Sequence, residues 1–144
     1  MVFLSALFFA LTSCATLKER HIETAKKVLS SMQQGNGELI HSMIALDADK
    51  IGSDVEHIKY DCESLTILQK KYGVINVSKM KYIVNPTDFV TPYMVEFPVF
   101  EGEDTIWNKR VKGISLRILF GPENVNSPNK IAYYEIYFDR ILVP

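Results

Sequence analysis

The sequence contains little cysteine, little net charge and none of the short motifs that mark common enzyme classes. Its 144 residues include two cysteines, Cys14 and Cys62, and no internal disulfide is possible if Cys14 is modified. Sixteen Lys and Arg nearly balance 17 Asp and Glu, and the net charge of −1 gives no electrostatic case for binding nucleic acid. Gly-x-Ser-x-Gly, phosphate-loop and dinucleotide-binding patterns are absent. No repeat or long linker divides the chain, whose length suits one domain.

Histidine is also scarce, which limits the chemistry that the sequence can suggest. None of His21, His41 and His57 has a partner at metal-ligand spacing, so we expect no metal site and no cofactor. His57 and Asp61 are four residues apart and would share a helix face. Such a pair can orient a general base, or it can be an ordinary exposed pair, which is the interpretation we favour.

The N-terminal segment is uncharged and apolar from residue 2 to residue 11, and the first charged residue is Lys18. This run has the length of a signal-peptide core and is too short to span a bilayer, which needs about 20 residues. It leads into Leu11-Thr12-Ser13-Cys14, a tetrad that resembles the lipobox of bacterial lipoproteins. An ordinary buried strand or helix is the alternative.

The lipobox resemblance implies that residues 1–13 are a cleaved signal peptide and that Cys14 carries acyl chains. Residues 14–16 would then be the lipidated N-terminus, and residues 17–144 one α+β domain. Several acyl chains would attach the protein to a membrane permanently. An Asp after the cysteine marks inner-membrane retention in Gram-negative lipoproteins. Ala15 stands there, which implies the outer membrane of a bacterial cell envelope, facing the periplasm. Cys62, the remaining thiol, is predicted to be a small buried hydrophobe.

Periodicity and capping residues predict three helices. The first begins at the capping box Thr16-Leu17-Lys18-Glu19 and ends at Gly35-Asn36-Gly37. A short second helix carries Leu39, Ile40, Met43 and Ile44 on one side. The third begins at a second capping box, Ser53-Asp54-Val55-Glu56, and closes at Gly73. Its apolar stripe comprises Val55, Ile58, Cys62, Leu65, Leu68 or Gln69, and Tyr72.

After Gly73 the apolar pattern changes to a period of two, which predicts strands near residues 74–84, 92–101, 107–120 and 130–143. Turns are expected at residues 85–88, 101–104 and 121–129. Consecutive strands with short links predict an antiparallel meander, with the helices covering one face. The predicted fold class is therefore α+β, with N-terminal helices packed on a curved antiparallel four-stranded sheet.

Alternation along the strands assigns the two faces of the sheet. The inner face is predicted to carry Tyr93, Val95, Phe97, Val99, Ile114, Leu116, Ile118, Phe120, Tyr134, Ile136, Phe138 and Leu142. The outer, wetted face is predicted to carry Lys79, Lys81, Glu96, Arg117, Glu135 and Asp139, together with Leu119, Tyr133 and Tyr137.

This arrangement resembles the nuclear-transport-factor-two-like and cystatin-like cone folds over about residues 17–143. The resemblance depends on Gly35-Asn36-Gly37-Glu38-Leu39-Ile40, between the first two helices, and on the long final pair of strands. It implies a sheet curled around the helices, open at one end as an enzyme pocket, a ligand pocket or packed core. Ketosteroid isomerases and polyketide cyclases of this shape use an Asp or His base with Tyr or Asp donors. None of their motifs maps onto this chain, so no catalytic residue is assigned.

Aromatic side chains are the remaining candidates for a site. Tyr93 and Tyr134 on the inner face, and Trp107 at the start of the third strand, are predicted to bind a ligand. Alternatively, the tyrosines reach the core edge and bond to backbone or water. The predicted function is a lipid-anchored, non-catalytic envelope domain that binds a small apolar ligand or an envelope protein. The alternatives are an isomerase- or cyclase-like enzyme, or a structural module that forms a homodimer through its outer sheet face.

Overall fold

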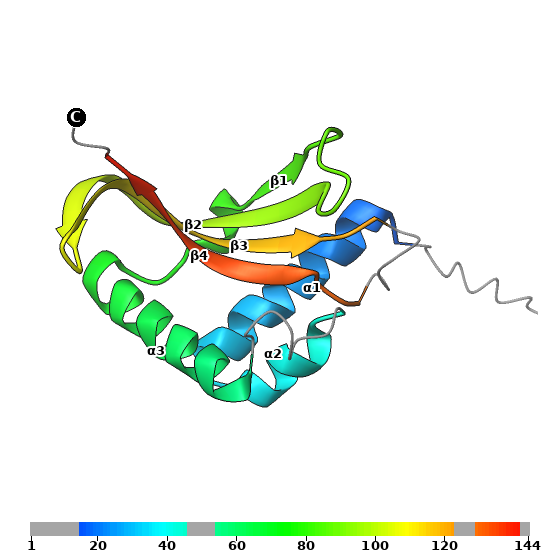
Figure 1. Ribbon diagram of the computed structural model, residues 1–144, viewed down its shortest axis with the longest axis horizontal. Coiled ribbons are helices and arrows are strands. Elements are labelled where there is room, and N and C mark those ends of the chain that lie inside the picture. The colour runs from blue at the N-terminus through cyan, green and yellow to red at the C-terminus, as the bar shows by residue number, and fades with distance from the viewer. Residues whose placement is uncertain (1–14, 46–53, 123–128, 142–144) are drawn as a thin grey trace, which may run out of the picture.

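Three α-helices precede a four-stranded antiparallel sheet in the computed structural model, which describes residues 15–45, 54–122 and 129–141 (Figure 1). The predicted α+β fold class is confirmed: the helices pack on one face of a curled, open sheet. The predicted signal peptide, Cys14, Ser53 and Leu142 lie outside the described residues. The elements, in chain order, are α1 (Leu17–Gln33), α2 (Gly37–Met43), α3 (Val55–Tyr72), the short 3-10 helix η2 (Val77–Lys79), β1 (Lys81–Val84), β2 (Tyr93–Ile106), β3 (Lys109–Phe120) and β4 (Tyr133–Arg140).

The first helix begins and ends as its sequence predicts. The Thr16 hydroxyl accepts a hydrogen bond from the Glu19 amide, and the Glu19 carboxylate accepts one from the Thr16 amide. This reciprocal pair is the predicted capping box. After α1 ends, Gly35 takes a φ of 68°, a conformation that glycine adopts without steric cost. The Asn36 side chain then caps α2 by accepting from the Leu39 amide.

The third helix begins one residue later than predicted. Its N-cap is Asp54, whose carboxylate accepts a hydrogen bond of 2.7 Å from the His57 amide. The predicted capping box with Ser53 as N-cap is therefore wrong. A carboxylate caps as well as a hydroxyl does, and its charge also suits the positive end of the helix dipole. The helix closes at Gly73, as predicted, with a φ of 99°.

The sheet is the predicted meander, in the order β1-β2-β3-β4, but its first strand is shorter than predicted. Residues 77–79 form η2, because the Asn76 side chain accepts hydrogen bonds from both the amide and the hydroxyl of Ser78. Lys79 therefore belongs to η2 and not to the outer face of a strand. Lys81 does pair with Glu96 across β1 and β2.

The turn between β2 and β3 also differs from the prediction. Residues 101–104 lie within β2, and the chain reverses at Trp107 and Asn108, whose φ values are 48° and 61°. Trp107 thus occupies the turn instead of starting β3. Gly102, with a φ of 140°, lies where the pairing register shifts between Glu101 and Asp104. The glycine permits a bulge, which bends a strand without ending it.

The bend brings the β2–β3 hairpin over the C-terminal end of α3 (Figure 1). The Tyr72 hydroxyl donates a hydrogen bond of 2.7 Å to Asp104, and Lys71 Nζ lies 2.7 Å from the same carboxylate oxygen. Because Lys71 and Tyr72 both favour its charged form, the pKa of Asp104 is lowered to about 2. The curl of the sheet is therefore fastened to the helical layer by polar contacts.

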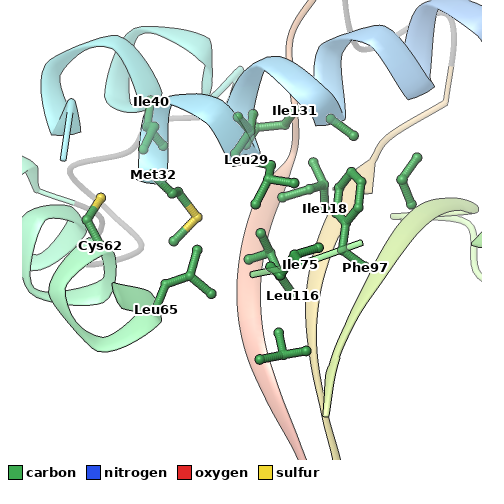
Figure 2. Packing of buried hydrophobic residues seen from close by; sticks show 14 of the residues in the cluster. Leu29, Met32, Ile40, Cys62, Leu65, Ile75, Phe97, Leu116, Ile118 and Ile131 are labelled. Carbon is green, nitrogen blue, oxygen red and sulfur yellow. The ribbon is translucent and has the colours of Figure 1, made fainter. Parts of the chain in front are cut away.

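The space between the sheet and the helices is filled with buried side chains (Figure 2). The predicted inner face is confirmed on β2 and β3, where Val95, Phe97, Leu116 and Ile118 are fully buried. Tyr93, Tyr134, Ile136 and Phe138 pack against the same core at its edge. The helices contribute Ala25, Val28, Leu29, Met32, Ile40, Ile58, Cys62, Leu65 and Leu68.

Candidate functional site

The three aromatic residues predicted to bind a ligand occupy separate parts of the molecule. Tyr93 is the first residue of β2, and Trp107 follows the last. The 14 residues of β2 correspond to about 45 Å of extended chain. Trp107 instead packs at the hairpin against Phe138, with the ring centroids 5.6 Å apart. Tyr134 lies on β4, two strands from β2. The structure therefore does not bring these three side chains together.

Tyr93 belongs to an aromatic cluster around a buried histidine that sequence reasoning missed. The His21 side chain, on the first turns of α1, is only 3% exposed. Its ring stacks on Phe120 at 4.1 Å between centroids and lies 5.1 Å from the ring of Tyr93. Its Nδ1 atom is 3.0 Å from the Tyr82 hydroxyl oxygen. These contacts join the start of α1 to β1, β2 and β3.

The environment of His21 keeps its imidazole neutral at ordinary pH. Burial, and secondarily the neighbouring charge of Arg20, lower its pKa to about 4. A neutral imidazole can donate or accept one hydrogen bond at Nδ1, which suits the Tyr82 hydroxyl. The sequence did contain an indication that His21 is buried, because it lies four residues before Ala25 on the buried stripe of α1.

Tyr134 makes a second polar connection, to the pair that the sequence singled out on α3. Its hydroxyl donates a hydrogen bond of 2.8 Å to Asp61, whose carboxylate lies 3.8 Å from Nε2 of His57. Burial, followed by the charge of Asp61, raises the pKa of Tyr134. A phenol has one O–H to donate, and here Asp61 accepts that hydrogen bond. The arrangement holds β4 to α3 and occupies the donor that a ligand would need.

An open apolar groove lies on a different side of α3, facing the turn between α1 and α2. Its volume is about 410 Å³, within the range of small-ligand sites. Gly37 lets α2 approach α3 closely: a Cβ atom there would lie 3.0 Å from Cγ of Lys59 and 3.1 Å from the carbonyl oxygen of Val55. An ion pair of 2.8 Å between Lys59 and Glu38 fastens the same two helices. The groove is lined by Gly35, Lys59, Cys62, Glu63, Thr66, Ile67 and Lys70.

The groove is suited to binding more than to reaction. Cys62 is buried at its base, and burial raises the pKa of this thiol to about 11. The thiol is therefore protonated and unreactive at neutral pH, as expected for a small buried hydrophobe. Ile67 is 50% exposed and offers apolar surface, and the charged residues Lys59, Glu63 and Lys70 also line the groove. None of Tyr93, Trp107 and Tyr134 lines this groove.

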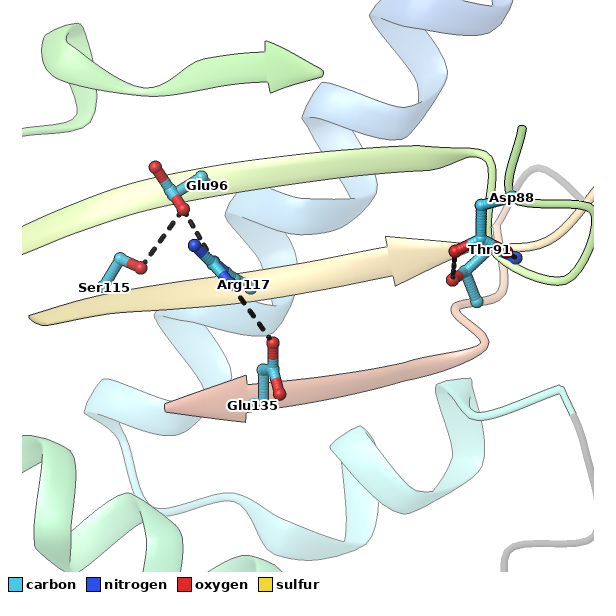
Figure 3. Close-up of polar contacts among 6 residues, drawn as sticks. All are labelled: Asp88, Thr91, Glu96, Ser115, Arg117 and Glu135. Carbon is cyan, nitrogen blue, oxygen red and sulfur yellow. Dashed lines mark hydrogen bonds and ion pairs between the residues drawn. The ribbon is translucent and has the colours of Figure 1, made fainter. Parts of the chain in front are cut away.

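The outer face of the sheet carries the predicted cross-strand charges (Figure 3). Arg117 on β3 lies between Glu96 on β2 and Glu135 on β4, with N···O separations of 2.7 and 3.7 Å. The Arg117 guanidinium also stacks on the ring of Tyr137 at 3.4 Å. Leu119 and Tyr133 pair across β3 and β4 toward one end of this face. Tyr133 is 37% exposed, but Leu119, predicted to lie on the wetted face, is only 8% exposed, so that part of the prediction is wrong.

Within the described residues, no group of three or more His, Cys, Asp and Glu side chains is placed to hold a metal ion. No helix among those residues is long and apolar enough to cross a membrane. No family model, curated protein or solved structure matches the chain.

Proposed function

We propose that this protein is a lipid-anchored, non-catalytic binding domain of the bacterial cell envelope, which holds a small apolar ligand in the groove beside α3. The observation that carries the binding proposal is the groove itself, with a volume of about 410 Å³ around the half-exposed Ile67. The anchor is supported by the lipobox-like Leu11-Thr12-Ser13-Cys14. Ala15, where retained lipoproteins carry Asp, supports the periplasmic side of the outer membrane.

The position of α1 agrees with an anchor at Cys14. The helix begins at Leu17 and is capped by Thr16, so the folded domain begins three residues after the cysteine. Such a short connection would keep the domain at the membrane surface. Each buried methylene of an acyl chain contributes about 0.8 kcal/mol, and two or more chains give stable attachment.

The enzyme alternative has one observation in its favour, the chain of His57, Asp61 and Tyr134. A carboxylate between an imidazole and a phenol can take part in acid–base chemistry. However, these three residues do not line the groove, and the Tyr134 proton is directed to Asp61. The dimer alternative would use Tyr133 on the outer face, next to the charges of Arg117 and its partners, but the paired Leu119 is only 8% exposed and offers little apolar surface. The groove favours the binding function over both.

The anchor is tested by the intact mass of the full chain expressed in a Gram-negative bacterium and purified from its membranes. We expect a mass that lacks residues 1–13 and includes acyl chains, and a protein that fractionates with the outer membrane. Cys14→Ser should abolish both the processing and the acyl mass. A wild-type protein with an unprocessed N-terminus would contradict the anchor.

The groove is tested by native mass spectrometry of the same membrane-purified protein. A bound apolar molecule should appear as extra mass that leaves on denaturation. Ile67→Asp should lose this mass because it places a charge in the groove. Tyr60→Asp is the matched control, since Tyr60 is an exposed residue of α3 outside the groove lining. A wild-type protein that carries no such mass but co-purifies with an envelope protein would assign the groove to a protein partner and contradict a small ligand.

A further inference from the structure

The loop between β1 and β2, residues 85–92, exposes large apolar side chains to solvent. Phe89 is 85% exposed and Val90 is 70% exposed, and Val84 at the end of β1 is 53% exposed. Single exposed apolar residues are common on protein surfaces, but several close together mark an interaction surface.

The polar side chains of this loop are used within the loop itself. One carboxylate oxygen of Asp88 accepts hydrogen bonds from the amides of Val90 and Thr91. The other oxygen accepts a hydrogen bond from the Thr91 hydroxyl (Figure 3). Asn85 makes the same kind of contact with the amide and hydroxyl of Thr87. The loop is therefore internally braced, and its charged group is already hydrogen-bonded while Phe89 and Val90 remain uncovered.

The loop lies at the same end of the molecule as the start of α1, and the β2–β3 hairpin lies at the opposite end (Figure 1). Val84 and Tyr93, which flank the loop, pair across β1 and β2. Tyr93 packs against His21 near the start of α1. The Lys18 ammonium lies 5.7 Å above the ring of Tyr82 on β1. The first two turns of α1, which follow Cys14 in the sequence, are thus attached to the strands that carry the loop.

We propose that Phe89 and Val90 insert into the interfacial region of the bilayer that holds the lipidated Cys14. This second contact fixes how the domain faces the membrane, and it rests on the anchor of the proposed function. Apolar side chains gain by leaving water at the headgroup boundary, and Lys18 on the same end suits anionic headgroups. The β2–β3 hairpin and Trp107 then face away from the membrane.

The test uses tryptophan fluorescence of the full-length, membrane-purified protein in vesicles of phosphatidylethanolamine and phosphatidylglycerol. Trp107 is the one native tryptophan, so the wild type reports on the hairpin end. The double variant Phe89→Trp, Trp107→Phe moves the probe to the loop, where the exposed Phe89 leaves room for it. We expect a blue-shifted emission, loss of most of the signal with brominated lipids, and little quenching by aqueous acrylamide. Wild-type Trp107 should be quenched by aqueous acrylamide and should keep most of its signal with brominated lipids.

The intact mass of each sample separates this proposal from the anchor. In an acylated sample, the tryptophan at residue 89 could be quenched by acrylamide but not by brominated lipid. That result would overturn membrane insertion of the loop, while the lipid anchor would stand. Protection of that probe only in native envelopes, and not in vesicles, would assign the loop to a protein partner and also overturn it. A sample without acyl mass refutes the anchor, and the loop proposal falls with it.

Discussion

The Tyr134 hydroxyl donates a hydrogen bond of 2.8 Å to Asp61, which precedes it by 73 residues. The contact joins β4, the last strand, to the middle of α3. Asp61 also lies 3.8 Å from His57, one turn earlier on the same helix. A single carboxylate therefore links the far edge of the sheet to the helical layer.

Replacing Tyr134 by Phe should destabilise the protein by about 1 kcal/mol, because the half-buried Asp61 loses its donor while the ring packing remains. Urea unfolding followed by circular dichroism measures the change. Tyr133→Phe is the matched control, since the neighbouring Tyr133 ring points to the other, outer face of the sheet. Equal effects of the two variants would show that the Asp61 contact contributes nothing specific.

The neutral, buried His21 predicts an acid-sensitive fold. Its pKa is about 4 in the folded protein, against an ordinary value of 6.5, so the unfolded state binds the proton more readily. Stability should therefore be constant above about pH 6.5 and fall as the pH drops from 6.5 toward 4, by at most about 3 kcal/mol. Urea midpoints across this range measure it.

A His21→Phe variant should show a flatter profile between pH 6.5 and 4, because it removes the titrating group and keeps a ring in the cluster. The exposed His57 provides the comparison through His57→Gln. If the His21 variant retained the full pH dependence, another group would have to account for it.

Substitutions at two residues of α3 should distinguish an effect on stability from an effect on ligand binding. Leu65 is fully buried, and Leu65→Ala should cost about 2–5 kcal/mol through lost burial and the cavity that it leaves. Ile67 is half exposed in the groove, so Ile67→Ala should change stability by less than about 1 kcal/mol but weaken ligand retention. Thermal unfolding and native mass spectrometry measure the two effects. A large loss of stability from Ile67→Ala would show that Ile67 packs as a core residue and would contradict its role in a ligand groove.

The Asp104 contacts predict a measurable titration. Lys71→Met removes the cation 2.7 Å from the carboxylate, so the pKa of Asp104 should rise from about 2 toward 3.8, although Tyr72 still donates to it. Because the folded pKa is depressed, the contribution of Asp104 to stability is present above about pH 4 and is lost as the pH falls toward 2.

Carboxyl chemical shifts from nuclear magnetic resonance follow the Asp104 titration directly. Lys70→Met is the control, because Lys70 carries the same charge one residue earlier and lies in the groove instead. An unchanged Asp104 titration in the Lys71 variant would show that Lys71 does not set its charge state.

Several predicted elements depended on residues within a few positions of one another, and these were confirmed. The capping box of Thr16 and Glu19 spans four residues, and the glycine closure of α3 at Gly73 is equally local. Alternation along β2 and β3 assigned their inner faces because side chains of a strand point to alternate sides. The start of α3 and the turn between β2 and β3 were predicted wrongly because two local patterns compete at each. Ser53 and Asp54 both suit an N-cap, and Gly102 suits either a turn or a bulge until its partner strand is known.

The sequence by itself determined three helices, a four-stranded meander and the face of the sheet that is buried, because periodicity and short connections leave few alternatives. It also supplies the lipobox-like tetrad, which stays a prediction. Only the tertiary structure decided that His21 lies among Tyr82, Tyr93 and Phe120, that Tyr134 contacts Asp61, and that a groove opens beside α3. The contacts of His21 and Tyr134 join residues 61 or more positions apart. Their geometry depends on how whole elements pack, which no local pattern encodes.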